Sequence, residues 1–181
     1  MLHAKNGCLR LAAGEMDYIR FGSGARPLVM LPGVGDGLKT VRGMALPFAL
    51  LYRKLAKEFT VYVFSRRREL PPHFTTREMA ADQNEAMAAL GLSRAAVVGV
   101  SQGGMIAQWL AIDYSDKVGR LVLTVTLSRP NDTIRAVIAV GLSMMCYRSG
   151  KEERTCLGER QPSGRIGKLL YFLFQTASCF W

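Results

Sequence analysis

The sequence predicts an α/β fold, in which a mostly parallel, twisted sheet carries helices on both faces. From about residue 8 to residue 126, short apolar segments alternate with segments of helical periodicity, and this alternation is typical of such a sheet. The length of 181 residues suits one domain with a sizeable core. The composition, 49% apolar and 21% charged, is that of a folded globular chain.

The first elements predicted are a hairpin and a buried strand. Residues 8–24, CLRLAAGEMDYIRFGSG, form two strands that meet at Ala13-Gly14. Residues 27–31 form an apolar strand that runs into the glycine-rich loop LPGVGDG. Helical spacing then predicts a helix over residues 46–59, and alternation predicts a strand over residues 60–64.

The second half of the pattern begins with a helix-start signal. Residues 75–78, Thr-Thr-Arg-Glu, match a capping box, in which the Thr75 hydroxyl and the Glu78 carboxylate each satisfy a free backbone amide. This signal predicts a helix that runs to about Leu90. The elements expected after it are a strand over 95–100, a helix over 103–113 and a strand over 118–125.

The character of the sequence changes after residue 132. Residues 133–147 keep a helical apolar spacing, whereas residues 148–168 are polar, contain several glycines and lack periodicity. We therefore expect an α/β core over 1–132 and a partial lid or irregular C-terminal segment of the same domain over 133–181.

The net charge of +10 raises nucleic acid or an anionic surface as a partner, but its distribution does not favour either. Residues 128–181 hold 8 of the 24 basic and 4 of the 14 acidic residues, so the excess is spread along the chain. The one compact basic run, residues 66–68, has no nucleic-acid motif around it and is interpreted as a solvated loop. We expect no nucleic-acid partner.

The four cysteines are scattered without a CxxC pair or a neighbouring histidine cluster, which indicates neither a metal site nor a disulfide framework. No metal and no organic cofactor is expected. The N-terminal residues lack the apolar core of a signal peptide, and no stretch reaches the roughly 18 apolar residues of a membrane span. These features favour a cytoplasmic protein and leave its oligomeric state open.

The segment with the clearest chemistry is GVSQGG, residues 99–104. Gly99-Val100-Ser101-Gln102-Gly103 matches G-x-S-x-G at a predicted strand-to-helix junction, where a strained turn can present a serine as a nucleophile. Glycines beside that turn leave space that β-carbons would fill, and Gly104 lets the following helix pack closely. The helix N-terminus adds a positive dipole end beside the serine. The alternative is an ordinary turn in which Ser101 only caps the helix.

These features together resemble the α/β-hydrolase superfamily of the serine esterase type, over residues 8–132. The hairpin, the LPGVGDG loop, the GVSQGG turn and the segment AQWLAIDYSDKVGRLVLT all stand at matching positions. The resemblance implies that Ser101 attacks a carbonyl carbon and that the backbone N–H groups of Gln102 and Val34 form the oxyanion hole. Pro32-Gly33 replaces the His-Gly of many members, a mild departure because the donor is a backbone amide.

The histidine that this resemblance requires after the serine is missing from the sequence. The chain contains only His3 and His73, and both precede Ser101. We favour a hydrolase that lacks its last strands, with their acid and histidine loops. Two alternatives stay open: His73 acts as the base in a rearranged site, or the protein is a non-catalytic binder that retains the pocket.

The sequence does not single out one acidic residue as the acid of the triad. Asp132 follows the last predicted strand, a position that some members of the superfamily use, but we prefer it as a helix cap for residue 133 onward. Asp36 is interpreted as a turn residue. Three other aspartates, Asp82, Asp113 and Asp116, are expected to face solvent.

The predicted function is therefore hydrolysis of a small carboxylic ester or related carbonyl compound, weakened or abolished because the triad is incomplete. An incomplete triad typically costs about 10⁴- to 10⁶-fold in rate. A non-catalytic binding or interaction protein is the alternative from another class. Acyl transfer to an acceptor other than water uses the same serine turn and is not distinguished from hydrolysis by the sequence.

Overall fold

The computed structural model describes residues 2–33 and 40–129, and every structural statement below concerns these two ranges. Residues 1–128 form one compact unit. Its six strands are β1 (Lys5–Leu11), β2 (Gly14–Phe21), β3 (Arg26–Leu31), β4 (Phe59–Arg67), β5 (Ala95–Val100) and β6 (Val118–Thr124).

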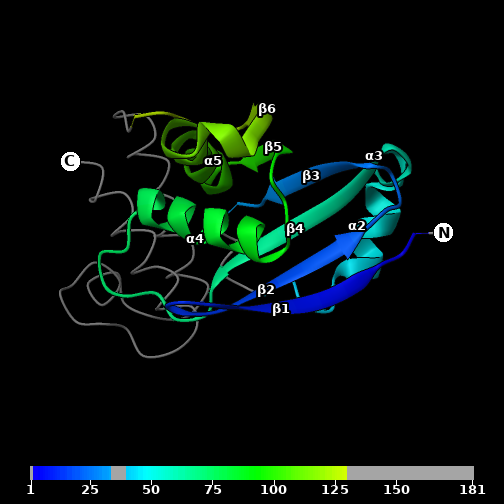
Figure 1. Cartoon of the computed structure of the whole chain (residues 1–181), viewed down its shortest axis with the longest axis horizontal. Coiled ribbons are helices and arrows are strands. Elements are labelled where there is room, and N and C mark those ends of the chain that lie inside the picture. The colour runs from blue at the N-terminus through cyan, green and yellow to red at the C-terminus, as the bar shows by residue number, and fades with distance from the viewer. Residues whose placement is uncertain (1, 34–39, 130–181) are drawn as a thin grey trace, which may run out of the picture. The chain divides into compact units, whose positions relative to one another are not determined.

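One mixed sheet joins these strands in the order β1-β2-β4-β3-β5-β6 (Figure 1). Strands β4, β3, β5 and β6 run parallel, whereas the β1–β2 hairpin is antiparallel and pairs with β4 through β2, also antiparallel. The carboxyl ends of the four parallel strands therefore meet at one edge of the sheet, where ligands bind in open α/β sheets.

Helices cover both faces of this sheet. Helices α2 (Ala45–Leu51) and α3 (Arg53–Glu58) pack on the face that carries Val61 and Val63, together with the partly buried Ala96 and Val98. Side chains alternate along a strand, so Val97 and Gly99 point to the other face. That face is covered by α5 (Gln102–Asp113), which packs beside α4 (Thr76–Ala89). The α/β prediction is confirmed.

Most predicted elements lie within one or two residues of their observed bounds. The capping box of α4 is present, because the Thr75 hydroxyl accepts a hydrogen bond from the Glu78 amide and the Glu78 carboxylate accepts one from the Thr75 amide. The helix predicted over 46–59 is instead two short helices that meet at Tyr52, and Phe59 already belongs to β4.

Two predictions about charged residues were wrong. The basic run 66–68 is not a solvated loop, because β4 continues to Arg67 and buries both Arg66 and Arg67. Asp82 does not face solvent, because α4 turns it toward Arg67, and the two side chains form a buried ion pair of 3.4 Å. Asp113 is exposed as expected and pairs with Arg77 of α4.

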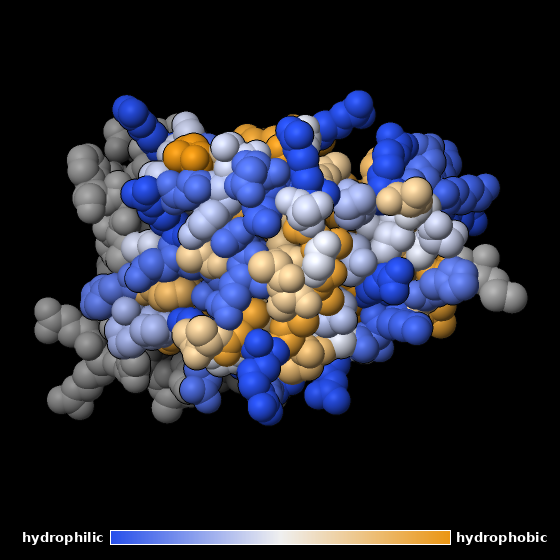
Figure 2. All heavy atoms as spheres, in the orientation of Figure 1, coloured by the Kyte–Doolittle hydropathy of each residue, from blue (hydrophilic) through white to orange (hydrophobic). Residues whose placement is uncertain are grey.

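Hydrophilic residues are distributed across the face shown in Figure 2 and do not gather in one patch. This distribution agrees with the dispersed charge of the sequence. Among the described residues, no helix combines the length and the apolar character needed to cross a membrane.

Candidate active site

Ser101 occupies a strained turn between β5 and α5. Its backbone has φ 52° and ψ −120°, a conformation that residues other than glycine rarely adopt. Its side chain makes no capping hydrogen bond to the helix, which contradicts the interpretation of Ser101 as a simple helix cap. The residue is half-buried.

The three glycines around Ser101 stand where any side chain would collide with neighbouring atoms. A β-carbon at Gly99 would lie 2.6 Å from the Gly103 carbonyl oxygen, and one at Gly103 would overlap the carbonyl group of Leu31. A β-carbon at Gly104 would lie 2.5 Å from Cβ of Thr126. The turn therefore packs directly against the ends of β3 and β6, and only glycine allows this approach.

Backbone and side-chain hydrogen bonds fix this turn from the β6 side. The Ser101 amide donates to the Thr124 carbonyl at 3.0 Å, and the Thr126 hydroxyl donates to the Ser101 carbonyl at 2.8 Å. The Gln108 side-chain amide donates to the Leu127 carbonyl at 3.0 Å, which ties the residues after β6 to α5. Sequence reasoning missed Thr126, because its partner lies 25 residues away.

The first turn of α5 supplies amide donors beside the Ser101 side chain. The leading N–H groups of a helix have no acceptor inside the helix and carry its positive dipole end. The Gln102 amide, one of the two predicted oxyanion donors, belongs to this group. The other, Val34, lies outside the described residues, but Gly33 just before it is close: a β-carbon there would lie 3.4 Å from Cβ of Ser101.

A buried arginine connects the two segments that flank Ser101. Arg66 is 3% exposed, and its Nη2 donates a 2.7 Å hydrogen bond to the Pro32 carbonyl and makes a longer contact of 3.5 Å with Oε1 of Gln102. Burial lowers the pKa of Arg66 to about 10, so the guanidinium is charged at neutral pH. Sequence reasoning missed Arg66, because a run of three arginines was interpreted as a solvated loop. The signal that could have found it is its position at the carboxyl end of a parallel strand.

The remaining candidates for the base and the acid are His73, Asp132 and Asp36. His73 lies exposed, with φ 61°, on the loop that follows β4 and thus at the same edge of the sheet as Ser101. None of the hydrogen bonds described for Ser101 involves it. Asp132 and Asp36 lie outside the described residues. The described residues thus bring together Ser101, the Gln102 amide and the glycines Gly99, Gly103 and Gly104.

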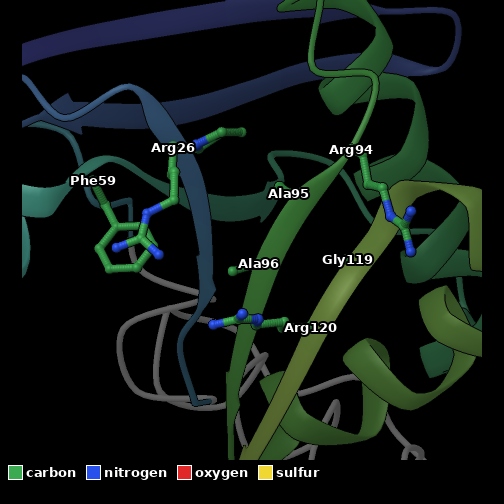
Figure 3. A pocket seen from close by; sticks show the side chains of 8 residues that line it. Arg26, Phe59, Arg94, Ala95, Ala96, Gly119 and Arg120 are labelled. Carbon is green, nitrogen blue, oxygen red and sulfur yellow. The ribbon is translucent and has the colours of Figure 1, made fainter.

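A shallow cavity of about 310 Å³ lies at the opposite edge of the sheet (Figure 3). Its lining comes from the amino-terminal ends of the parallel strands and includes Arg26, Phe59, Ala95 and Arg120. Arg26 stacks on the Phe59 ring and forms an exposed ion pair with Glu58. This cavity contains none of the predicted site residues and is separate from the Ser101 turn.

Comparison with known proteins agrees with this architecture. Over 146 residues the chain is 41% identical to a Caulobacter vibrioides protein named "Putative carbamate hydrolase RutD"; the match covers 75% of this chain and 52% of that protein. The chain thus spans about half the length of this relative.

Two solved structures have a similar fold. A hydrolase from Pseudomonas aeruginosa PA01 superposes with a TM-score of 0.62 at 21% identity, over 97% of this chain and 71% of that one. An enol-lactonase from Burkholderia xenovorans LB400 gives a TM-score of 0.61 at 19% identity, over 96% and 72% of the two chains. A family model described as the alpha/beta hydrolase fold matches residues 26–144, which include β3, the Ser101 turn and β6, and the chain belongs to this family.

Proposed function

We propose that the chain carries the nucleophile and oxyanion part of a serine hydrolase site that acts on a small carboxylic ester or related carbonyl compound. The observation that carries this proposal is the strained backbone of Ser101, held by three glycines that tolerate no side chain. A protein retains a turn of this kind when a side chain must be presented at a defined point, and a nucleophile needs that presentation.

The chemistry assigned to the described residues is acyl transfer. Ser101 Oγ attacks the carbonyl carbon and gives up its proton to a base or to water, while the carbonyl π electrons move to oxygen and form a tetrahedral oxyanion. The Gln102 amide, with Val34 as the second donor, stabilises this oxyanion. Collapse of the intermediate then expels the leaving group and leaves an acyl group on Ser101, which water removes.

The residue that accepts the Ser101 proton is the least defined part of the proposed site. His73 is a candidate base because its loop lies at the same sheet edge as Ser101, and Asp132 is a candidate acid. Asp132 lies outside the described residues, and none of the hydrogen bonds described for Ser101 involves His73. We propose weak or undetectable turnover for this chain, because without an assigned base the oxyanion hole and substrate binding alone leave roughly 10³- to 10⁴-fold acceleration over water.

Carbamates are candidate substrates beside carboxylic esters. The Caulobacter relative is named for carbamate hydrolysis, and a carbamate carbonyl offers the same electrophilic carbon to Ser101. Aryl esters and aryl carbamates with the same leaving group allow the two classes to be compared by their rates of phenol release. We expect acylation of Ser101 by both, with release of the phenol.

The test is covalent labelling with a fluorophosphonate probe. Serine attack on phosphorus forms an O–P bond, fluoride leaves, and the serine proton passes to a base or to water. We expect slow labelling at Ser101, seen by mass spectrometry of the modified peptide, and none in Ser101→Ala. A chain that binds an aryl ester but is not labelled at all would favour the second candidate, a non-catalytic binder.

A further inference from the structure

Arg66 is the one buried cation at the serine turn, among the described residues, that the proposed chemistry leaves without a task. It stands on β4, two strands away from β5 in the sheet order, and is 3% exposed. Its neighbours in sequence have carboxylate partners, since Arg67 pairs with Asp82 and Arg68 with Asp17. Arg66 has no ion pair within the described ranges. A buried charge without a counter-ion costs folding free energy, so we infer that Arg66 has a structural or functional role at this position.

The groups that Arg66 contacts lie directly on either side of the nucleophile. Pro32, which accepts the 2.7 Å hydrogen bond, immediately follows β3 and precedes Gly33, the residue that backs onto the Ser101 side chain. Gln102, whose Oε1 lies 3.5 Å from the same Nη2, follows Ser101 and carries a predicted oxyanion amide. One guanidinium nitrogen thus bridges the end of β3 and the start of α5.

The cluster is rich in donors and poor in acceptors. Arg66 Nε and Nη1 and Gln102 Nε2 are buried without a hydrogen-bond partner among the described residues. These three unpaired nitrogen donors and the guanidinium charge make the space beneath the turn electropositive. A developing negative charge on an adjacent group is favoured by such surroundings, because the buried site screens it less than water would.

We propose that Arg66 is a positioning residue, which ties the Pro32 carbonyl to the Gln102 side chain and so holds the Gln102 amide in place beside Ser101. The effect of Arg66 on catalysis rests on the proposed function. Its contacts with Pro32 and Gln102 belong to the fold and do not depend on that function. Displacement of a donor by about 1 Å costs on the order of 10²-fold in rate, so loss of the link has a measurable effect.

The experiment compares the wild-type chain with Arg66→Met, Arg66→Lys and the matched control Arg68→Met. Methionine fills much of the arginine volume but donates no hydrogen bond, and lysine keeps both the charge and a donor for Pro32. Arg68→Met removes the same charge from a more exposed neighbour. The first readout is the second-order rate of fluorophosphonate labelling at Ser101. The second is amide hydrogen exchange in peptides that cover residues 31–33 and 102–105.

We expect Arg66→Met to lower the labelling rate by about 10- to 100-fold, with Arg66→Lys recovering part of it and Arg68→Met unchanged. Exchange should rise in the two named peptides of Arg66→Met and stay unchanged in the β1–β2 hairpin. Unchanged labelling together with unchanged exchange in those peptides would overturn the inference, and so would an equal rise of exchange in every peptide. If the wild-type chain is not labelled, the proposed function fails, and the exchange readout alone still decides the role of Arg66.

Discussion

Gly103 packs against the carbonyl group of Leu31 so closely that a β-carbon on Gly103 would overlap that group. The atoms met there are backbone atoms at the end of β3, which cannot rotate away as a flexible side chain would. The contact fixes the distance between α5 and the strand beneath it. It also explains why the position after Gln102 has to be glycine.

This relationship predicts that Gly103→Ala destabilises the chain by about 3 kcal/mol, at the upper end of typical overpacking costs. The free energy of unfolding, measured by urea denaturation, checks it. The matched control is Gly119→Ala in β6, where the nearest atoms to a new β-carbon lie at an ordinary 3.4 Å. We expect that control to leave the stability unchanged or to raise it by up to about 1 kcal/mol, because alanine restricts the unfolded chain more than glycine does. Equal stabilities of the two variants would contradict the packing described here.

The second prediction concerns the hydroxyl of Thr126, which donates to the Ser101 carbonyl at 2.8 Å. Thr126→Val keeps the shape of the side chain but leaves that carbonyl without this donor, so we expect a loss of about 1 kcal/mol. Labelling of Ser101 should slow as well, because the turn is held less firmly. Thr124→Val is the control, since that side chain is exposed. If both valine variants unfold at the same urea concentration as the wild type, the hydrogen bond contributes nothing.

Sequence signals predicted those features that depend on interactions between residues close together in the chain. The capping box at Thr75 and the strained turn at Ser101 follow from residue types within a few positions of one another. The alternation of apolar and polar residues likewise predicted the strand bounds to within a few residues. The candidate nucleophile could therefore be named from six letters of sequence.

The parts that sequence reasoning missed depend on contacts between distant segments. A run of three arginines is typical of a solvated loop, yet the fold places Arg66 between β3 and α5 and turns Arg67 toward Asp82. Nothing within that run distinguishes its two buried members from the more exposed Arg68. Only the sheet order, which brings β4 beside β3, makes them part of the interior.

The burial of Asp82 beside Arg67 predicts a specific pH dependence of stability. Burial raises the pKa of Asp82 to about 6, with Arg67 opposing the rise, whereas the unfolded chain releases this proton near 3.8. Because the folded-state pKa is raised, the stability contributed by Asp82 is complete below pH 3.8 and is lost as the pH rises through about 6. Relative to Asp82→Asn, the wild type should lose on the order of 2 kcal/mol between pH 4 and pH 7.5.

Asp113 provides the control for this prediction, with the opposite sign. A hydrogen bond from Arg77 lowers the pKa of Asp113, so its contribution to stability is present above the ordinary pKa and is lost as the pH falls. Urea denaturation of the wild type, Asp82→Asn and Asp113→Asn across this pH range measures both slopes. A difference between the wild type and Asp82→Asn that does not change with pH would rule out a raised pKa at Asp82.

The last prediction concerns β6, which pairs with β5 and has no second strand neighbour among the described residues. Its apolar side chains are unusually open for a parallel strand, since Val122 is 53% and Leu123 41% exposed. An exposed apolar edge strand offers unpaired backbone groups to another chain. We expect Val122→Lys to reduce self-association, because a charge on the edge strand opposes pairing with a second edge. Light scattering against protein concentration measures this. Ile112→Lys adds the same charge at a 66% exposed helical position and should have a smaller effect. If the helix variant suppresses association as strongly as Val122→Lys does, added charge explains the result and the β6 edge does not.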